Sequence, residues 1–249
     1  MGIEHIIADT DASELGIGYT PLITSGLEYL NFFGGSSAIG RNLAPGKDDG
    51  VVVGTPVAGT MAEGTTFRQT QNYLQTSVAH TGAMTLLAVG ASVGEYETLL
   101  ISNYTGGDIG MSLMMRTSAV DSQLLGSCIA TYIASGGAKT LKEVVTPETI
   151  PVNTFQTLVA QVNNVDGGNI KLTNLSTGLS YTSSAYPAGS TPVISGNLRI
   201  GSGVAAVGPV SSTEILFVAI YSRVLSDDEV AALYAQIQTF YLASKAVVI

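Results

Sequence analysis

The chain has 249 residues, of which 45% are hydrophobic and only 12% are charged, and its formal net charge at pH 7 is −9. This length accommodates one large β-sandwich or two smaller domains, and the hydrophobic fraction is enough for a substantial core. The acidic balance excludes electrostatic binding to nucleic acid, because few Lys and Arg are present to replace phosphate counterions, and it disfavours attraction to anionic membranes.

The first 25 residues differ from the rest of the chain. Residues 1–25 carry polar side chains interrupted by Gly16, Gly18 and Pro21, so we expect an arm or attachment segment. From residue 26 on, short apolar or alternating runs separated by turn residues predict β-strands. In the first half of the chain these runs cover residues 27–33, 51–53, 73–76, 84–89, 98–102, 109–115 and 124–133.

The second half of the chain continues with a charged stretch and more strands. Residues 138–152 contain several charged side chains and two prolines, Pro147 and Pro151, which predict a loop. The turn Asp166-Gly167-Gly168-Asn169 predicts a hairpin between its flanking runs. The runs that predict strands cover residues 155–163, 170–175, 197–201 and 213–222.

A helix is predicted at 226–243. Ser226-Asp227-Asp228-Glu229 forms a capping box, in which the Ser226 hydroxyl accepts from the third helical amide and Glu229 reaches back. An apolar stripe follows at Val230, Leu233, Tyr234, Ile237 and Phe240 or Tyr241. Many strand-like runs and one terminal helix predict an all-β, two-sheet antiparallel jelly-roll sandwich over residues 26–249, with the helix at its C-terminal end.

The closing segment of the chain carries a family resemblance. Residues 214–234 resemble the end of concanavalin A-like and laminin G-like domains, which finish with a strand, an aromatic residue, an Arg-x-Leu-Ser turn and an acidic-capped helix. The matching residues here are Tyr221, Arg223, Leu225, Ser226, Asp228, Glu229 and Tyr234. The resemblance covers about 26–243 and implies a fold shared by lectins, adhesion modules, glycan hydrolases and virion proteins. The low charge and the Gly, Ser and Thr content resemble bacteriophage tail or fibre components.

Cysteine content and the N-terminus indicate where the protein is made. Cys128 is the only cysteine, so an intrachain disulfide is excluded, and we expect a buried small side chain because neither His5 nor His80 lies nearby in sequence. No basic segment followed by a long apolar run begins the chain, and no apolar run has the length of a membrane span. We therefore expect synthesis in a cytoplasm, no membrane insertion and, with the phage resemblance, a place in the virion.

One pair of carboxylates is a candidate catalytic site. A glycoside hydrolase needs two such groups, and strand alternation would place Glu95 and Glu97 on one face. Related sandwich hydrolases carry Glu-x-Asp-x-x-Glu, whose third acid is absent here, and Gly94 indicates a turn. We expect solvated loop carboxylates and no enzymatic activity.

Turn residues are the candidates for ligand and metal binding. A shallow sugar site would draw on loop side chains, and because the chain has no Trp, Tyr would have to stack against the sugar. The ligand-binding candidates are Tyr104, Asp108, Asp166, Asn169 and Tyr181. Asp48 and Asp49 are candidates for Ca²⁺, although Asp in turns commonly bonds its own backbone. We expect no other cofactor.

Three functions remain open from the sequence. The preferred one is a non-enzymatic virion structural or receptor-binding protein of the phage tail or fibre type, forming a homo-oligomer, contacting other virion proteins and binding a cell-surface glycan. The second is a free-standing lectin-like module that binds carbohydrate. The third is a glycoside hydrolase that uses Glu95 and Glu97.

Overall fold

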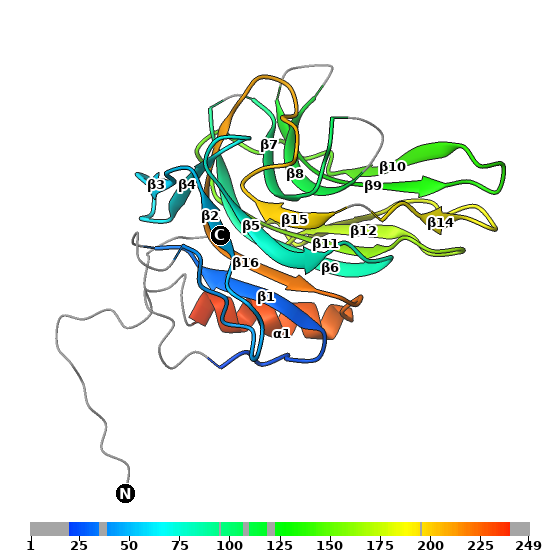
Figure 1. Cartoon of the computed structure of the whole chain (residues 1–249), viewed down its shortest axis with the longest axis horizontal. Helices are drawn as coiled ribbons and strands as arrows, with labels where there is room; N and C mark the ends of the chain where they lie inside the picture. Colours follow the sequence, from blue (N-terminus) through cyan, green and yellow to red (C-terminus); the bar gives the residue numbers. More distant parts are fainter. Residues whose placement is uncertain are drawn as a thin grey trace, which may run out of the picture.

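The computed structural model describes residues 20–34, 39–94, 96–106, 110–118, 123–194 and 196–239. These residues form two antiparallel sheets, A and B, with one helix, α1 (Asp227–Ile237), beside sheet A (Figure 1). Sheet A consists of β1 (Leu27–Phe32), β3 (Val57–Ala58), β4 (Thr65–Arg68), β6 (Ala83–Val93), β11 (Gln156–Asn163), β12 (Ile170–Asn174), β13 (Leu179–Thr182) and β16 (Ser212–Tyr221). Sheet B consists of β2 (Val51–Val53), β5 (Tyr73–Ala79), β7 (Thr98–Ser102), β8 (Met111–Thr117), β9 (Leu124–Ile133), β10 (Lys139–Val145), β14 (Thr191–Pro192) and β15 (Asn197–Ile200).

This architecture confirms the predicted all-β, two-sheet antiparallel sandwich with one C-terminal helix. Sheet A has the order β13-β12-β11-β6-β16-β4-β3, with β1 also paired to β16. Sheet B has the order β10-β9-β8-β7-β15-β5-β2, with β14 also paired to β9. The hairpin predicted at 166–169 joins β11 and β12, which pair antiparallel.

The prediction of a loop over residues 138–152 is wrong in its first half, where the chain forms β10. This strand pairs along its whole length with β9 at the end of the sheet B order. Its charged side chains Lys139 and Glu143 are exposed, while Val144 is buried. Charged residues are compatible with an edge strand, because one of its sides faces no neighbouring strand.

Sheet A is covered on both faces. Side chains of successive residues alternate between the two faces, so Leu86 and Ala88 of β6 join the core between the sheets. Leu87 and Val89 of the same strand join a second apolar cluster that includes Leu233 and other residues of α1. The side chains of β16 also alternate between these two apolar clusters. Because both faces of this strand are buried, its sequence is a continuous apolar run and does not alternate between apolar and polar residues.

Helix α1 begins as the sequence predicts. The backbone N–H of Glu229 donates to the Ser226 hydroxyl at 3.2 Å, and the N–H of Ser226 donates to the Glu229 carboxylate at 2.8 Å. The Arg223 guanidinium also pairs with both Glu229 oxygens at 2.6 and 2.8 Å. This ion pair lowers the pKa of Glu229 to about 2. The described helix ends at Ile237, and residues 240–243 of the predicted span lie outside the described part of the chain.

The segment 20–26 lies along this helical side of the sandwich. The Gln236 side chain donates to the carbonyl of Thr20 at 2.8 Å and accepts from the N–H of Leu22 at 3.2 Å. Arg223 donates to the carbonyl of Ser25 at 2.8 Å. These contacts involve only the last residues of the arm predicted at 1–25, because residues 1–19 lie outside those that the structure describes.

A buried carboxylate connects β16 to the loop between β3 and β4. Glu214 is fully buried. Its two oxygens accept hydrogen bonds of 3.0–3.1 Å from the backbone N–H groups of Thr60, Met61, Ala62 and Gly64. A Cβ at Gly59 would lie 2.1 Å from the carboxyl carbon, so glycine is required for this close approach. The charge is stabilised by oriented backbone dipoles.

Replacing Glu214 with Ala removes the acceptor for four backbone donors and leaves a cavity. We expect the free energy of unfolding to fall by roughly 3–5 kcal/mol in urea denaturation. Asp166→Ala, which removes an exposed carboxylate from the β11–β12 turn, is the control and should change it by less than about 0.5 kcal/mol. Equal, small effects of the two substitutions would contradict a structural role for the buried carboxylate.

Candidate functional site

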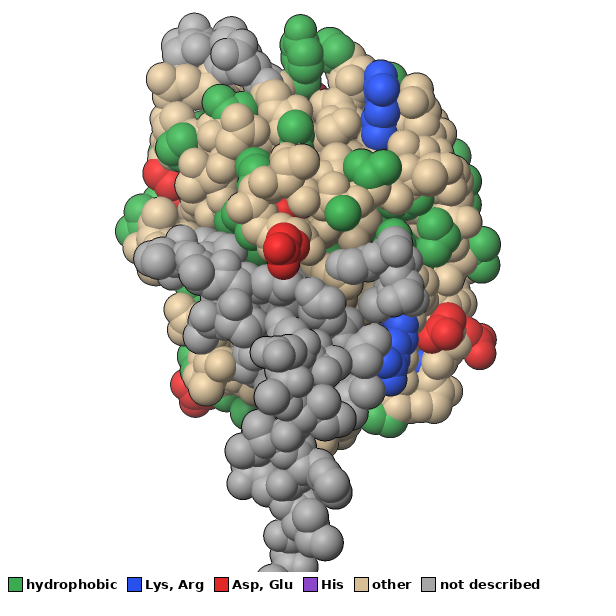
Figure 2. Space-filling model, turned by 90° about the vertical axis from the view of Figure 1, so that its left-hand side faces the viewer, with side chains coloured by type: hydrophobic (Ala, Val, Ile, Leu, Met, Phe, Trp, Pro, Cys, Tyr) green, Lys and Arg blue, Asp and Glu red, His purple; other side chains and the backbone are tan. Residues whose placement is uncertain are grey.

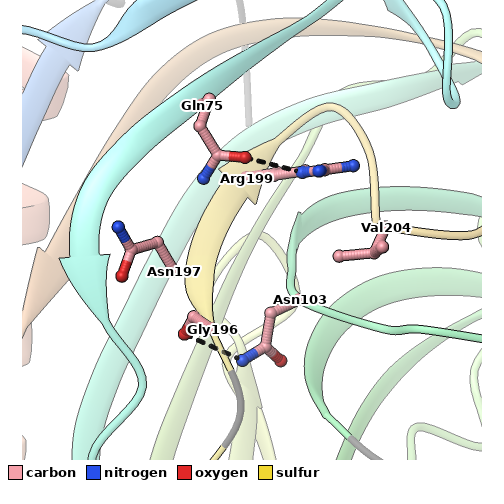
Figure 3. A pocket seen from close by; sticks show the side chains of 6 residues that line it. All are labelled: Gln75, Asn103, Gly196, Asn197, Arg199 and Val204. Carbon is pink, nitrogen blue, oxygen red and sulfur yellow. Dashed lines mark hydrogen bonds between the residues drawn. The ribbon is translucent and has the colours of Figure 1, made fainter.

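An open pocket of about 420 Å³ lies on the outer face of sheet B, where β5, β15 and the end of β7 meet (Figure 3). Strand alternation creates it. Leu74 of β5 and Leu198 of β15 point into the core between the sheets, so the neighbouring Gln75 and Arg199 point outward. The residues that line the pocket are Gln75, Asn103, Gly196, Asn197, Arg199 and Val204.

Arg199 is held in one orientation by three neutral contacts. Its Nε donates to the Gln75 side-chain oxygen at 2.8 Å, and its Nη1 donates to the carbonyl of Gly203 at 2.9 Å. The guanidinium carbon lies 4.6 Å from the centroid of the Tyr73 ring, within the range of a cation–π interaction. Gln75 is itself fixed, because its amide nitrogen donates to the carbonyl of Leu198 at 3.3 Å.

The two asparagines of the pocket have different environments. Asn103 is buried, and its side-chain oxygen accepts from the N–H of Met111 at 2.6 Å, while its amide nitrogen donates to the carbonyl of Gly196 at 3.5 Å. Asn197 is exposed, and its amide makes no hydrogen bond to another described residue. Asn103 therefore shapes the pocket wall, and Asn197 offers a donor and an acceptor to a ligand.

The loop 201–208 closes one side of the pocket and contributes Val204, whose side chain is 48% exposed. Its position is set by the backbone. The N–H of Ala205 donates to the carbonyl of Tyr104 at 2.9 Å, and a Cβ at Gly203 would lie 2.8 Å from the same carbonyl oxygen. Glycine is therefore needed where this loop crosses the end of β7.

The ligand-binding residues proposed from the sequence do not form one site. Tyr104 adjoins the pocket through its backbone contact with the loop 201–208. Asp166 and Asn169 lie in the β11–β12 turn and Tyr181 lies on β13, all in sheet A. Asp108 is outside the described residues. The sequence analysis missed Arg199, although the alternation in its predicted strand 197–201 indicates that it points outward.

Of the two carboxylates considered for catalysis, only Glu97 is described, and it does not line the pocket. Glu95 lies outside the described residues, and Glu97 lies in the turn between β6 and β7. Burial raises the pKa of the Glu97 carboxyl, and the nearby charge of Arg116 opposes this shift. The Glu97 carbonyl accepts from the Gln69 amide at 2.8 Å and from the Ser211 hydroxyl. The Glu97 backbone is thus held by side chains that are distant in sequence.

The two metal candidates, Asp48 and Asp49, make hydrogen bonds to a nearby residue of the same loop. Asp49 accepts the N–H of Asn42 at 2.8 Å through its side chain, and the Asp48 carbonyl accepts the Asn42 amide at 3.0 Å. Across the described ranges, no group of three or more His, Cys, Asp or Glu residues is placed to hold a metal ion. Cys128 is buried as expected, and burial raises the pKa of its thiol.

His80 is a buried titratable group outside the set of residues that line the pocket. It follows β5, its side chain is 1% exposed, and neither ring nitrogen has a hydrogen-bond partner among the described residues. Burial without a partner lowers its pKa to about 4, because the charged imidazolium is disfavoured away from water. The neutral ring therefore belongs to the folded state.

The lowered pKa of His80 makes stability depend on pH. A histidine whose pKa falls on folding binds more protons in the unfolded chain between its unfolded pKa of 6.5 and about 4. The free energy of unfolding should therefore decrease by about 2 kcal/mol from pH 7 to pH 5. His80→Phe should abolish most of this decrease in urea denaturation, and His5→Gln, the control, should preserve it. An unchanged slope in His80→Phe would contradict the assignment.

No protein-family model matches the sequence. None of the curated proteins is significantly similar to it. Within the described residues, no helix has the length and apolarity needed to cross a bilayer.

The fold itself is similar to solved receptor-binding domains of clostridial toxins. The botulinum neurotoxin serotype D ligand-binding domain, solved in complex with N-acetylneuraminic acid, aligns with a TM-score of 0.59 and 12% identity over 86% of this chain. The receptor-binding domain of botulinum neurotoxin type G aligns with a TM-score of 0.57 and 13% identity over 85% of this chain. The binding domain of Paraclostridial Mosquitocidal Protein 1 aligns with a TM-score of 0.56 and 12% identity over 87% of this chain.

The chain spans about half the length of these neighbours, 52% of the first two and 53% of the third. At this identity the likeness shows the fold alone, a two-sheet sandwich of the concanavalin A-like type. It agrees with the resemblance found in the closing segment of the sequence.

Proposed function

We propose that this chain is a non-enzymatic module that binds a carbohydrate on a receptor, and that the pocket between β5 and β15 is its sugar site. The observation that carries the proposal is the set of outward-facing polar groups on one sheet face. Gln75 and Arg199 are fixed by hydrogen bonds, and the exposed Asn197 amide lies beside them. Amide and guanidinium groups pair with sugar hydroxyls, and the exposed Val204 offers an apolar surface.

The position of this pocket supports binding rather than structural packing. Sheet A is covered on its outer face by the cluster that includes α1, whereas the pocket opens on the outer face of sheet B. The structural neighbours are receptor-binding or ligand-binding domains, one of them solved with N-acetylneuraminic acid. Their names support the proposal without fixing the ligand of this chain.

A place in a virion remains part of the proposal. The chain has few charges, and the side shown in Figure 2 presents mainly uncharged side chains with isolated Lys, Arg, Asp and Glu. Low surface charge and Gly, Ser and Thr richness support a tail or fibre component that forms a homo-oligomer and contacts other virion proteins. Light scattering tests the oligomer, and a strict monomer at all concentrations would count against it.

Asn197→Ala tests the sugar site with little risk to the fold, because the side chain is exposed. On a glycan array, we expect the wild-type chain to bind a restricted set of glycans and Asn197→Ala to lose roughly tenfold in affinity for them, the value of one good hydrogen bond. Gln71→Ala, which removes an exposed amide outside the pocket, is the control and should bind as wild type. Turnover of any bound glycan would contradict the non-enzymatic assignment.

A further inference from the structure

Four basic residues of the described chain form ion pairs with carboxylates. Arg223 pairs with Glu229 and Arg116 pairs with Glu143, each at 2.6 Å. Two lysines form similar pairs, Lys47 with Glu28 and Lys171 with Asp227. Arg199 forms no ion pair with a described carboxylate, a property that it shares with Lys142, whose hydrogen-bond partners are also neutral. Unlike Lys142, Arg199 lines the pocket. Its hydrogen-bond acceptors, the Gln75 side chain and the Gly203 carbonyl, are neutral.

The contacts of Arg199 leave part of its guanidinium available. An arginine has five N–H donors, and here one on Nε and one on Nη1 are used by the Gln75 side chain and the Gly203 carbonyl. The three remaining donors, one on Nη1 and two on Nη2, form an edge suited to two parallel hydrogen bonds. In Figure 3 the group extends past Gln75 toward the loop that carries Val204.

This arrangement lowers the cost of binding an anion. The Tyr73 ring and two hydrogen bonds already restrict the Arg199 side chain, so little of its rotamer freedom remains to be lost when a ligand binds. The half-buried position strengthens charge interactions relative to bulk water. Neutral acceptors leave the full positive charge uncompensated, in a chain whose net charge is −9.

We infer that the pocket is selective for an acidic sugar, whose carboxylate binds the free edge of the Arg199 guanidinium while its hydroxyls bind the Asn197 amide. This inference rests on the proposed function and adds the chemical class of the ligand. A carboxylate matches the planar edge in a bidentate manner, which a neutral hydroxymethyl group at the same position cannot do. Gln75 and Tyr73 are positioning residues, because they act through Arg199.

A matched pair of sugars tests this selectivity directly. Methyl β-D-glucuronide and methyl β-D-glucoside differ only in a carboxylate against a hydroxymethyl group, and the methyl glycoside of N-acetylneuraminic acid is a second acidic probe. Two-dimensional NMR titrations of the full chain give the affinities and locate the perturbed amides. We expect at least one acidic probe to bind about tenfold more tightly than the glucoside, with amides of β5, β15 and the loop 201–208 perturbed.

Substitutions of Arg199 test whether its side chain produces the preference for acidic sugars. Arg199→Met should reduce acidic-sugar affinity to the level of the glucoside, whereas Arg68→Met, which removes an exposed arginine from β4 in sheet A, should leave it unchanged. Arg199→Lys retains the charge but not the planar edge, so it should bind several-fold more weakly and still prefer the acidic sugar. It also serves as the informative variant if thermal melting shows that Arg199→Met is unfolded.

The outcomes separate the inference from the proposed function. If the glucoside binds as tightly as both acidic probes, or if Arg199→Lys and a folded Arg199→Met retain wild-type affinity, the acidic selectivity is overturned while the sugar site stands. If no probe and no arrayed glycan binds, both are overturned. If acidic probes bind but perturb only amides of α1 or β13, the location of the site is wrong.

Discussion

The whole arrangement depends on the burial of β16 on both of its faces. Ile215, Val218 and Ile220 pack into the core between the sheets, while Phe217 and Ala219 pack beneath the helical side. The strand also pairs with β6 along one edge and with β4 and β1 along the other. Because both faces of the strand are buried, its polar groups need hydrogen-bond partners within the protein. Its one charged side chain, Glu214, accepts hydrogen bonds from four backbone N–H groups.

This constraint determines which surface is free for function. Because α1 and the segment from residue 20 cover much of the outer side of sheet A, that side leaves only a smaller pocket of about 150 Å³, between α1 and β12, for a ligand. Sheet B faces sheet A with its apolar side chains, and its β5 and β15 carry Gln75, Asn197 and Arg199 on the opposite face. The same alternation that builds the core therefore builds the pocket, and Gly203 allows the loop that carries Val204 to pass close to the Tyr104 carbonyl.

Fold and site differ in how far the sequence predicts them. Strand runs, the 166–169 turn and the Ser226 capping box depend on local periodicity and turn chemistry, so they were predictable from neighbouring residues. The charged edge strand β10 was missed because its pairing partner, not its own composition, determines its structure. The pocket is formed by β5, β15 and the end of β7, which are far apart in sequence. Gln75 and Arg199 lie side by side only because β15 pairs between β5 and β7.

Hydrogen–deuterium exchange with and without the most tightly bound glycan tests the central claim, that burial of sheet A leaves the outer face of sheet B as the binding surface. We predict that bound glycan slows exchange in peptides covering β5, β15 and the loop 201–208, while peptides of β16 and α1, protected already in the free protein, are unchanged. Protection gained over α1 or the outer side of sheet A, with none over β5 and β15, would contradict the account.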